Sequence, residues 1–146
     1  MSKSNVSVVF WVIAAIALLW NLMGVLAFAG DFLITPEALD LLDEQTPGYK
    51  ALYESNPGWL KLFYGIATIG GLLGAIFLLL RKKIALPLFI ASLIAVLIQM
   101  GYSMFATNAR EVLGTNSAVI MPIFVICISA FLVYYTRKGI ANQWIN

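Results

Sequence analysis

The sequence contains no histidine. Histidine is the commonest general base near neutral pH and the commonest metal ligand in proteins. Cys127 is the only cysteine, so the chain cannot form an intrachain disulfide, and its apolar sequence neighbours predict an inert, buried thiol. No spacing of nucleophile and base, or of acid and base, points to a reaction. We therefore expect no enzyme, no catalytic residue, no metal site and no cofactor.

Charged residues are also scarce. They make up 11% of the chain, against about 25% in soluble domains, whereas 62% of the residues are hydrophobic and the mean hydropathy is +0.92. The net charge of +2 comes without a basic patch interleaved with aromatic residues, so nucleic acid is not an expected partner. This shortage of charge predicts a protein whose outer surface faces the lipid bilayer.

Four long apolar segments are present. The segment from Pro57 to Leu80 begins at an Asn56-Pro57 helix-start signal, has Lys61 as its only charge, and ends at three cations. About 20 apolar residues, each rising 1.5 Å along a helix, cross the roughly 30 Å hydrocarbon core of a bilayer. Segments of similar character cover 6–29, 84–106 and 118–136, with a polar turn at 107–117. The sequence predicts an all-α integral membrane four-helix bundle that forms a single domain over 1–146.

The polar segment 30–56 is too long for a structureless loop. Thr35-Pro36-Glu37 is an N-cap, a proline at the first helical position and an acid in the first turn, and Thr46-Pro47 repeats the first part of this signal. Apolar and aromatic residues follow both signals at helical spacing. We expect two short amphipathic helices, 35–45 and 47–55, that cap the ends of the spans.

The charges are distributed unevenly between the two sides of this layout. One side holds only cations, and these determine the topology: Lys3, Arg81, Lys82, Lys83, Arg137 and Lys138. The other side holds all 7 acidic residues, with Lys50, Lys61 and Arg110. Positively charged loops stay in the cytoplasm, so both termini are predicted to be cytoplasmic. We expect Arg137-Lys138 to end the fourth span and Trp144 to anchor the tail at the membrane surface.

A small set of polar residues lies deep in the spans. No carboxylate, lysine or arginine is among them, which disfavours a proton pump or an ion-coupled carrier. Asn21 and Gln99 lie equally far from the starts of two parallel spans, and Tyr64 and Tyr102 are expected near them, so these four residues are the candidate ligand-binding layer. The amides either join helices, in contacts worth about 0.6–2 kcal/mol, or line a polar cavity open to the outside. Such a cavity would bind a small neutral molecule or a lipid head group.

Two glycines of the second span, Gly70 and Gly74, form a G-x-x-x-G pattern. Small residues at this spacing allow two helix backbones to approach closely. One interpretation is packing within the bundle. The other is a homodimer formed through this face.

Four short motifs support a resemblance. They are Trp20-Asn21-Leu22-Met23-Gly24, Leu80-Arg81-Lys82-Lys83, Ser92-Leu93 with Gln99, and Met121-Pro122-Ile123. Over nearly its whole length the chain resembles a family of small four-helix bacterial inner-membrane proteins, some of which are labelled "sugar transporter" with no mechanism attached. The resemblance implies four helices in a bacterial inner membrane, with segment 30–56 in the periplasm.

Three classes of function follow from these observations. The first is a non-enzymatic membrane component that binds a partner protein or a lipid through its outer half. The second is a transporter of a small neutral, sugar-like solute, which would need an oligomer because four helices enclose little aqueous space. The third is an intramembrane enzyme, which the residues favour least.

Overall fold

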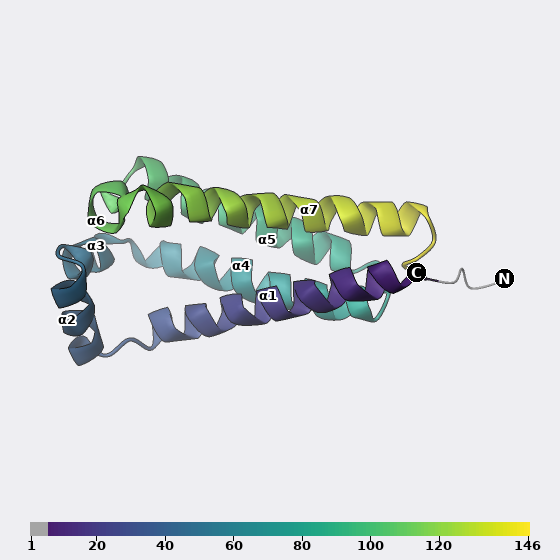
Figure 1. Cartoon of the computed structure of the whole chain (residues 1–146), viewed down its shortest axis with the longest axis horizontal. Coiled ribbons are helices and arrows are strands. Elements are labelled where there is room, and N and C mark those ends of the chain that lie inside the picture. Colours follow the sequence, from purple (N-terminus) through teal and green to yellow (C-terminus); the bar gives the residue numbers. More distant parts are fainter. Residues whose placement is uncertain (1–5) are drawn as a thin grey trace.

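A computed structural model describes residues 6–146, and every regular element in this range is a helix (Figure 1). Four helical segments are long and apolar enough to cross a membrane. They are α1 (Val8–Phe32), α4 (Gly58–Leu79), α5 (Ala85–Phe105) and a fourth segment, Ala109–Ala141, made of α6 (Ala109–Thr115), the π-helical turn η1 (Asn116–Ile120) and α7 (Met121–Ala141). The predicted fold class is confirmed.

The long helices pack in the order α1, α4, α5, α7. α4 lies between α1 and α5, and α7 packs on the other side of α5, so α1 and α7 are the outer members. In Figure 1 they lie close together at the end marked C and diverge toward the end that carries α2, α3 and α6. We call the first the basic end, because Arg81, Lys82, Lys83, Arg137 and Lys138 lie there, and the second the cap end.

The basic end is filled by side chains from all four helices. Phe10, Ala14, Leu78, Phe89 and Tyr135 belong to one buried cluster. The rings of Phe10 on α1 and Tyr135 on α7 stack with their centroids 6.2 Å apart. This cluster closes the space between the two outer helices.

The C-terminal tail completes this closure. Ile145 is 2% exposed, and the Trp144 ring lies 6.4 Å from Phe10 and 6.0 Å from Tyr135. Asn146 exchanges main-chain hydrogen bonds with the α4–α5 turn: its N–H donates to Arg81 O at 2.8 Å, and its carbonyl accepts from Lys83 N at 2.9 Å. The Trp144 ring is half-buried and packs against the buried cluster, and its role as an anchor at the membrane surface stays a prediction.

Arg137 and Lys138 do not end the fourth helix, and their place at the end of the membrane span stays a prediction. α7 continues through them to Ala141, since nothing in the side chains of two exposed cations prevents further helical turns. The chain then reverses at Gln143, which has a positive φ of 60°.

The predicted cap helices are present as α2 (Pro36–Gln45) and α3 (Tyr49–Ser55). Thr35 Oγ1 accepts a hydrogen bond from Ala38 N at 3.2 Å, as an N-cap does. Thr46 does not repeat this role: its N–H closes α2 on Leu42 O, and α3 starts only after Gly48, whose φ is 92°.

Asp43 takes the place that Thr46 was expected to fill. Its Oδ1 accepts from Lys50 N at 3.0 Å in the first turn of α3, and Lys50 Nζ reaches Asp40 at 2.6 Å. Asp40 and Asp43 of α2 therefore hold α3 against α2.

Segment 107–117, predicted as a polar turn, is largely helical. α6 breaks at Gly114, whose φ of 84° only glycine adopts readily, and η1 follows. Pro122 stands just after this π-helical turn, which accommodates a residue without an N–H inside a continuous segment. Leu52 of α3 packs on Ala109 and Ala118, so α3 and α6 together form the roof of the cap end.

Gly70 and Gly74 of α4 face α5. A Cβ at Gly74 would lie 2.8 Å from the Phe89 ring, and one at Gly70 would lie 3.6 Å from Leu88 O. Packing within the chain accounts for this pattern, and a homodimer through Gly70 and Gly74 stays a prediction. Cys127, expected to be buried, is exposed on α7.

Candidate functional site

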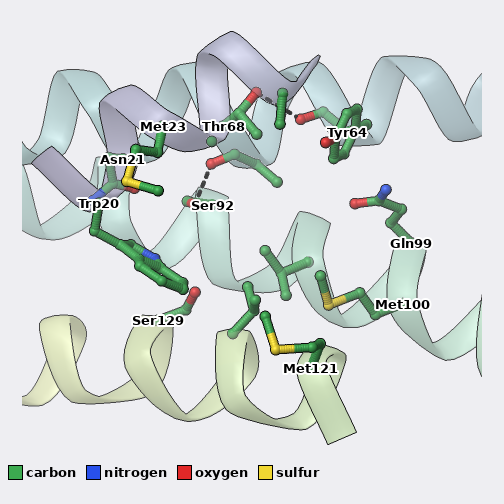
Figure 2. A pocket seen from close by; sticks show the side chains of 15 residues that line it. Trp20, Asn21, Met23, Tyr64, Thr68, Ser92, Gln99, Met100, Met121 and Ser129 are labelled. Carbon is green, nitrogen blue, oxygen red and sulfur yellow. Dashed lines mark hydrogen bonds between the residues drawn. The ribbon is translucent and has the colours of Figure 1, made fainter. Parts of the chain in front are cut away.

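A cavity of about 400 Å³ lies among α1, α4, α5 and α7, and we call it the inner pocket (Figure 2). Its walls are mostly apolar. The polar or sulfur-containing side chains that line it are Trp20, Asn21, Met23, Tyr64, Thr68, Ser92, Gln99, Met100, Met121 and Ser129. The pocket exists because α1 and α7 diverge beyond the packed basic end.

The inner pocket opens sideways between α1 and α7. Met23 on α1 and Met121 on α7 both line it, and yet they are 64% and 51% exposed. Trp20 bridges the two helices at mid-length, with its ring edge-on to Phe124 at 5.9 Å. In a bilayer this opening would face the hydrocarbon region, where methionine gives a flexible apolar rim.

The polar groups at one end of the inner pocket have partners. Asn21 Nδ2 donates to Ala17 O at 2.8 Å, and its Oδ1 lies against Gly71. Ser92 Oγ donates to Ala67 O on α4 at 2.6 Å (Figure 2). Ser92 therefore joins α5 to α4, whereas the hydrogen bond of Asn21 stays within α1 and its side chain only packs against Gly71 of α4.

Asn21 and Gln99 do not lie at the same depth. Asn21 is level with Gly71 and Ser92, whereas Gln99 is two helical turns further along α5, or about 10 Å (Figure 2). The expectation that Asn21 and Gln99 lie at matched depth is wrong, because α1 begins further out at the basic end than α5 does. The two amides share the pocket but do not face each other.

Gln99 differs from Asn21 in having an unsatisfied acceptor. Its Oε1 is buried and has no hydrogen-bond partner among residues 6–146. Tyr64 lies nearby in the same lining (Figure 2). Tyr102, the fourth candidate, does not line the inner pocket; its ring packs edge-on against Trp59 at 5.0 Å.

A second cavity of about 360 Å³ lies beneath the roof at the cap end, and we call it the outer chamber. It is lined by Asp31, Tyr53, Asn56, Leu60, Lys61, Tyr64, Gln99, Ser103, Leu113 and Ser117. A smaller lobe of about 210 Å³ shares seven of these ten residues and extends to Tyr49 and Thr107. Tyr64 and Gln99 line both the outer chamber and the inner pocket, so the two cavities meet there.

The outer chamber is built by contacts among three elements. Lys61 Nζ of α4 donates to Tyr53 Oη of α3 at 2.6 Å and lies 4.7 Å from the centre of that ring. Tyr53 Oη in turn donates to the main-chain O of Asp31 in α1 at 2.9 Å. This chain of hydrogen bonds ties the roof to two spans.

Tyr49 contributes a neutral hydroxyl to the smaller lobe. Burial raises the pKa of the Tyr49 phenol, and the nearby charge of Asp31 and the Tyr53 phenol raise it further. The phenol therefore stays protonated and can donate a hydrogen bond.

Of the ten residues that line the outer chamber, only Tyr64 and Gln99 were predicted as site residues, and three of the others, Asp31, Asn56 and Lys61, are important for its chemistry. α1 continues past its expected end and includes Asp31 in its last turn. Asn56 was interpreted as a helix start, but Pro57 is the N-cap of α4, and Asn56 Oδ1 is buried without a partner among the described residues. Lys61 stood out in the sequence as the only charge in its span, and this was a usable signal.

No group of three metal-ligating side chains occurs within the part of the chain that the structure describes.

Comparison of the chain with protein-family models, with curated proteins and with solved structures gives no match.

Proposed function

We propose that this protein binds a membrane lipid, with an acyl chain in the inner pocket and the polar head group in the outer chamber. One observation carries the proposal: an apolar cavity open sideways between α1 and α7 joins a polar chamber at the cap end. A lipid has this same order of apolar and polar parts along its length. A pocket of about 400 Å³ is also within the usual size of ligand sites.

The proposed orientation in the membrane agrees with this arrangement. The basic end carries cations alone among its described charges, so we place it in the cytoplasm and the cap in the periplasm of a bacterial inner membrane. The outer chamber then lies at the depth of the outer-leaflet head groups. A lipid of that leaflet would enter between α1 and α7 without turning over.

The test fills the inner pocket and asks whether lipid is lost. Gly24 lines the pocket, and a Cβ there meets only Thr68 at 3.5 Å, so Gly24→Leu adds bulk without a backbone clash. Gly30→Leu is the matched control, because it lies on the same helix with nothing within 4 Å of its Cβ. Both variants are purified in mild detergent and examined by native mass spectrometry.

We expect the wild type and Gly30→Leu to retain phospholipid, and Gly24→Leu to retain at least tenfold less. Equal retention by all three proteins would contradict the proposal. Circular dichroism of each variant confirms that the helices are intact.

Transport of a small neutral solute is the second candidate. It is favoured by the polar side chains that line a path from the outer chamber to Asn21 and Ser92 at mid-bundle. The path stops there, because the cluster around Phe10 and Tyr135 fills the basic end. Saturable uptake into vesicles that contain only this protein would support transport, and its absence alongside lipid retention would support the binding protein.

A further inference from the structure

The outer chamber contains two buried hydrogen-bond acceptors that nothing in the described chain satisfies. They are Asn56 Oδ1 at the end of α3 and Gln99 Oε1 on α5. Both residues line the same cavity. Buried polar atoms in folded proteins nearly always have partners, so two such acceptors in one chamber are places where a ligand can donate hydrogen bonds.

Asp31 adds a third acceptor to the same lining. Its side chain forms no ion pair within 4 Å among residues 6–146. A side-chain amide can rotate and present either an oxygen or an NH₂ group, but a carboxylate only accepts. The charged acceptor therefore indicates that the ligand group at this position is a donor, and a cation by preference.

Lys61 is the one cation of the outer chamber within the described residues. Its ammonium has three donors, and a single hydrogen bond, to Tyr53, is seen for it. The other donors can reach an anion in the chamber. One acid and one base together leave the chamber neutral, which suits a zwitterionic ligand and disfavours one with a net charge.

We propose that the ligand head group is a phosphate joined to a primary ammonium, as in an aminophospholipid of the phosphatidylethanolamine type. The three N–H donors of the ammonium match Asn56 Oδ1, Gln99 Oε1 and the Asp31 carboxylate, and the phosphate lies toward Lys61. This inference rests on the proposed lipid-binding function and adds the chemistry of the head group.

Two common head groups fit less well. A choline head group has the same charges but no N–H donor, so both amide oxygens would remain unsatisfied. A glycerol head group offers hydroxyl donors, and its phosphate can still face Lys61, but it brings no cation to offset the Asp31 carboxylate, so the chamber and ligand together carry a net negative charge. The chamber therefore disfavours a choline head group because it lacks N–H donors, and a glycerol head group because of its net charge.

The experiment compares these three head groups on identical chains. Full-length protein is reconstituted in equimolar dioleoyl phosphatidylethanolamine, phosphatidylcholine and phosphatidylglycerol, extracted in mild detergent, and its bound lipid is measured by native mass spectrometry. We expect phosphatidylethanolamine to be retained at least tenfold over each of the others. Equal retention of all three would overturn the head-group inference and leave lipid binding standing, whereas no retention of any lipid would overturn both.

Variants identify the groups responsible. Gln99→Leu removes an orphan acceptor and should reduce the phosphatidylethanolamine preference at least fivefold, and Asp31→Asn should shift retention toward phosphatidylglycerol. Tyr102→Phe is the control, because Tyr102 lies outside both cavities and its ring contact with Trp59 is preserved. A preference that survives Gln99→Leu and Asp31→Asn unchanged would refute the assignment even if the wild type selects phosphatidylethanolamine.

Discussion

At the residue scale, two buried polar side chains on α5 illustrate the difference between packing and binding. Ser92 is 5% exposed and donates to the main chain of α4, so its hydrogen-bonding capacity is used within the fold. Gln99 lies two turns away with a buried oxygen that has no partner in the described chain. Only the second group is available to a ligand.

This difference predicts opposite effects on stability. In ligand-free detergent micelles, Gln99→Leu should raise the thermal midpoint, because an unsatisfied buried acceptor costs about 1–3 kcal/mol. Ser92→Ala should lower it, by about 0.5–1 kcal/mol, through loss of an interhelical hydrogen bond. A fluorescence-detected unfolding curve for each variant measures both, and a fall for Gln99→Leu would show that its oxygen has a partner.

The sequence contained part of this information. Asn21, Tyr64 and Gln99 could be identified because polar residues are rare in apolar spans, and the structure places all three on the inner pocket. The partners of each side chain could not be predicted, since they depend on helix register. Gln99 lies two turns further along the bundle than Asn21, and it therefore also lines the outer chamber beneath the roof.

At the element scale, α4 and α5 are held together by close contact at glycine. Gly74→Ala would place its Cβ 2.8 Å from the ring of Phe89, which is 2% exposed and cannot move aside. Overpacking of this kind costs about 1–3 kcal/mol.

Gly101→Ala is the matched control on α5. A Cβ there meets nothing within 4 Å, and alanine is favoured over glycine inside a helix by roughly 0.5–1 kcal/mol. We expect Gly74→Ala to lower, and Gly101→Ala to raise, the midpoint of unfolding in detergent. Loss of a dimer on crosslinking, with unchanged monomer stability, would instead favour the homodimer interpretation of the G-x-x-x-G pattern.

The tail after α7 is the element that the sequence predicted least well. Segment 142–146 is short, and its apolar residues show neither helical nor strand spacing. Even so, Ile145 is only 2% exposed, and Gly139 provides the space for its side chain. The hydrogen bonds between Asn146 and the α4–α5 turn join residues that are far apart in sequence, and such contacts leave no local signal. The spans and cap helices, by contrast, follow from local signals: apolar length, prolines and caps.

The tail should therefore contribute to stability. Ile145→Ala removes a buried side chain at the basic end and should cost at least about 2 kcal/mol. Ile94→Ala, at a side chain that is 53% exposed, should lower the free energy of unfolding much less, and unfolding of both variants in detergent measures the difference. Equal effects would mean that the tail does not pack on the bundle in solution.

At the scale of the whole molecule, the charge distribution predicts orientation. Cations alone occupy the described basic end, and the acids of α2 and α3 lie at the cap end. In a Cys127→Ser background, a cysteine at Asp43 should react with an impermeant maleimide once the outer membrane is made permeable, and one at Lys82 should not. Labelling at Lys82 alone would reverse the orientation and place the outer chamber in the opposite leaflet.

The central claim is that lipid enters the inner pocket, and crosslinking from inside the pocket tests it most directly. Val96 lines the inner pocket and is only 5% exposed, so lipid of the surrounding bilayer does not reach it from the outside. A diazirine side chain placed at Val96 reacts with whatever lies in the cavity. The same group at Ile94 reports bulk lipid, and at Leu78, which is fully buried in the basic-end cluster, it reports background.

After irradiation in vesicles of dioleoyl phosphatidylethanolamine and phosphatidylglycerol, intact-mass spectrometry identifies any crosslinked lipid. We expect a phospholipid adduct at Val96 that approaches the yield at Ile94, and none at Leu78. An adduct at Ile94 with Val96 as empty as Leu78 would contradict it.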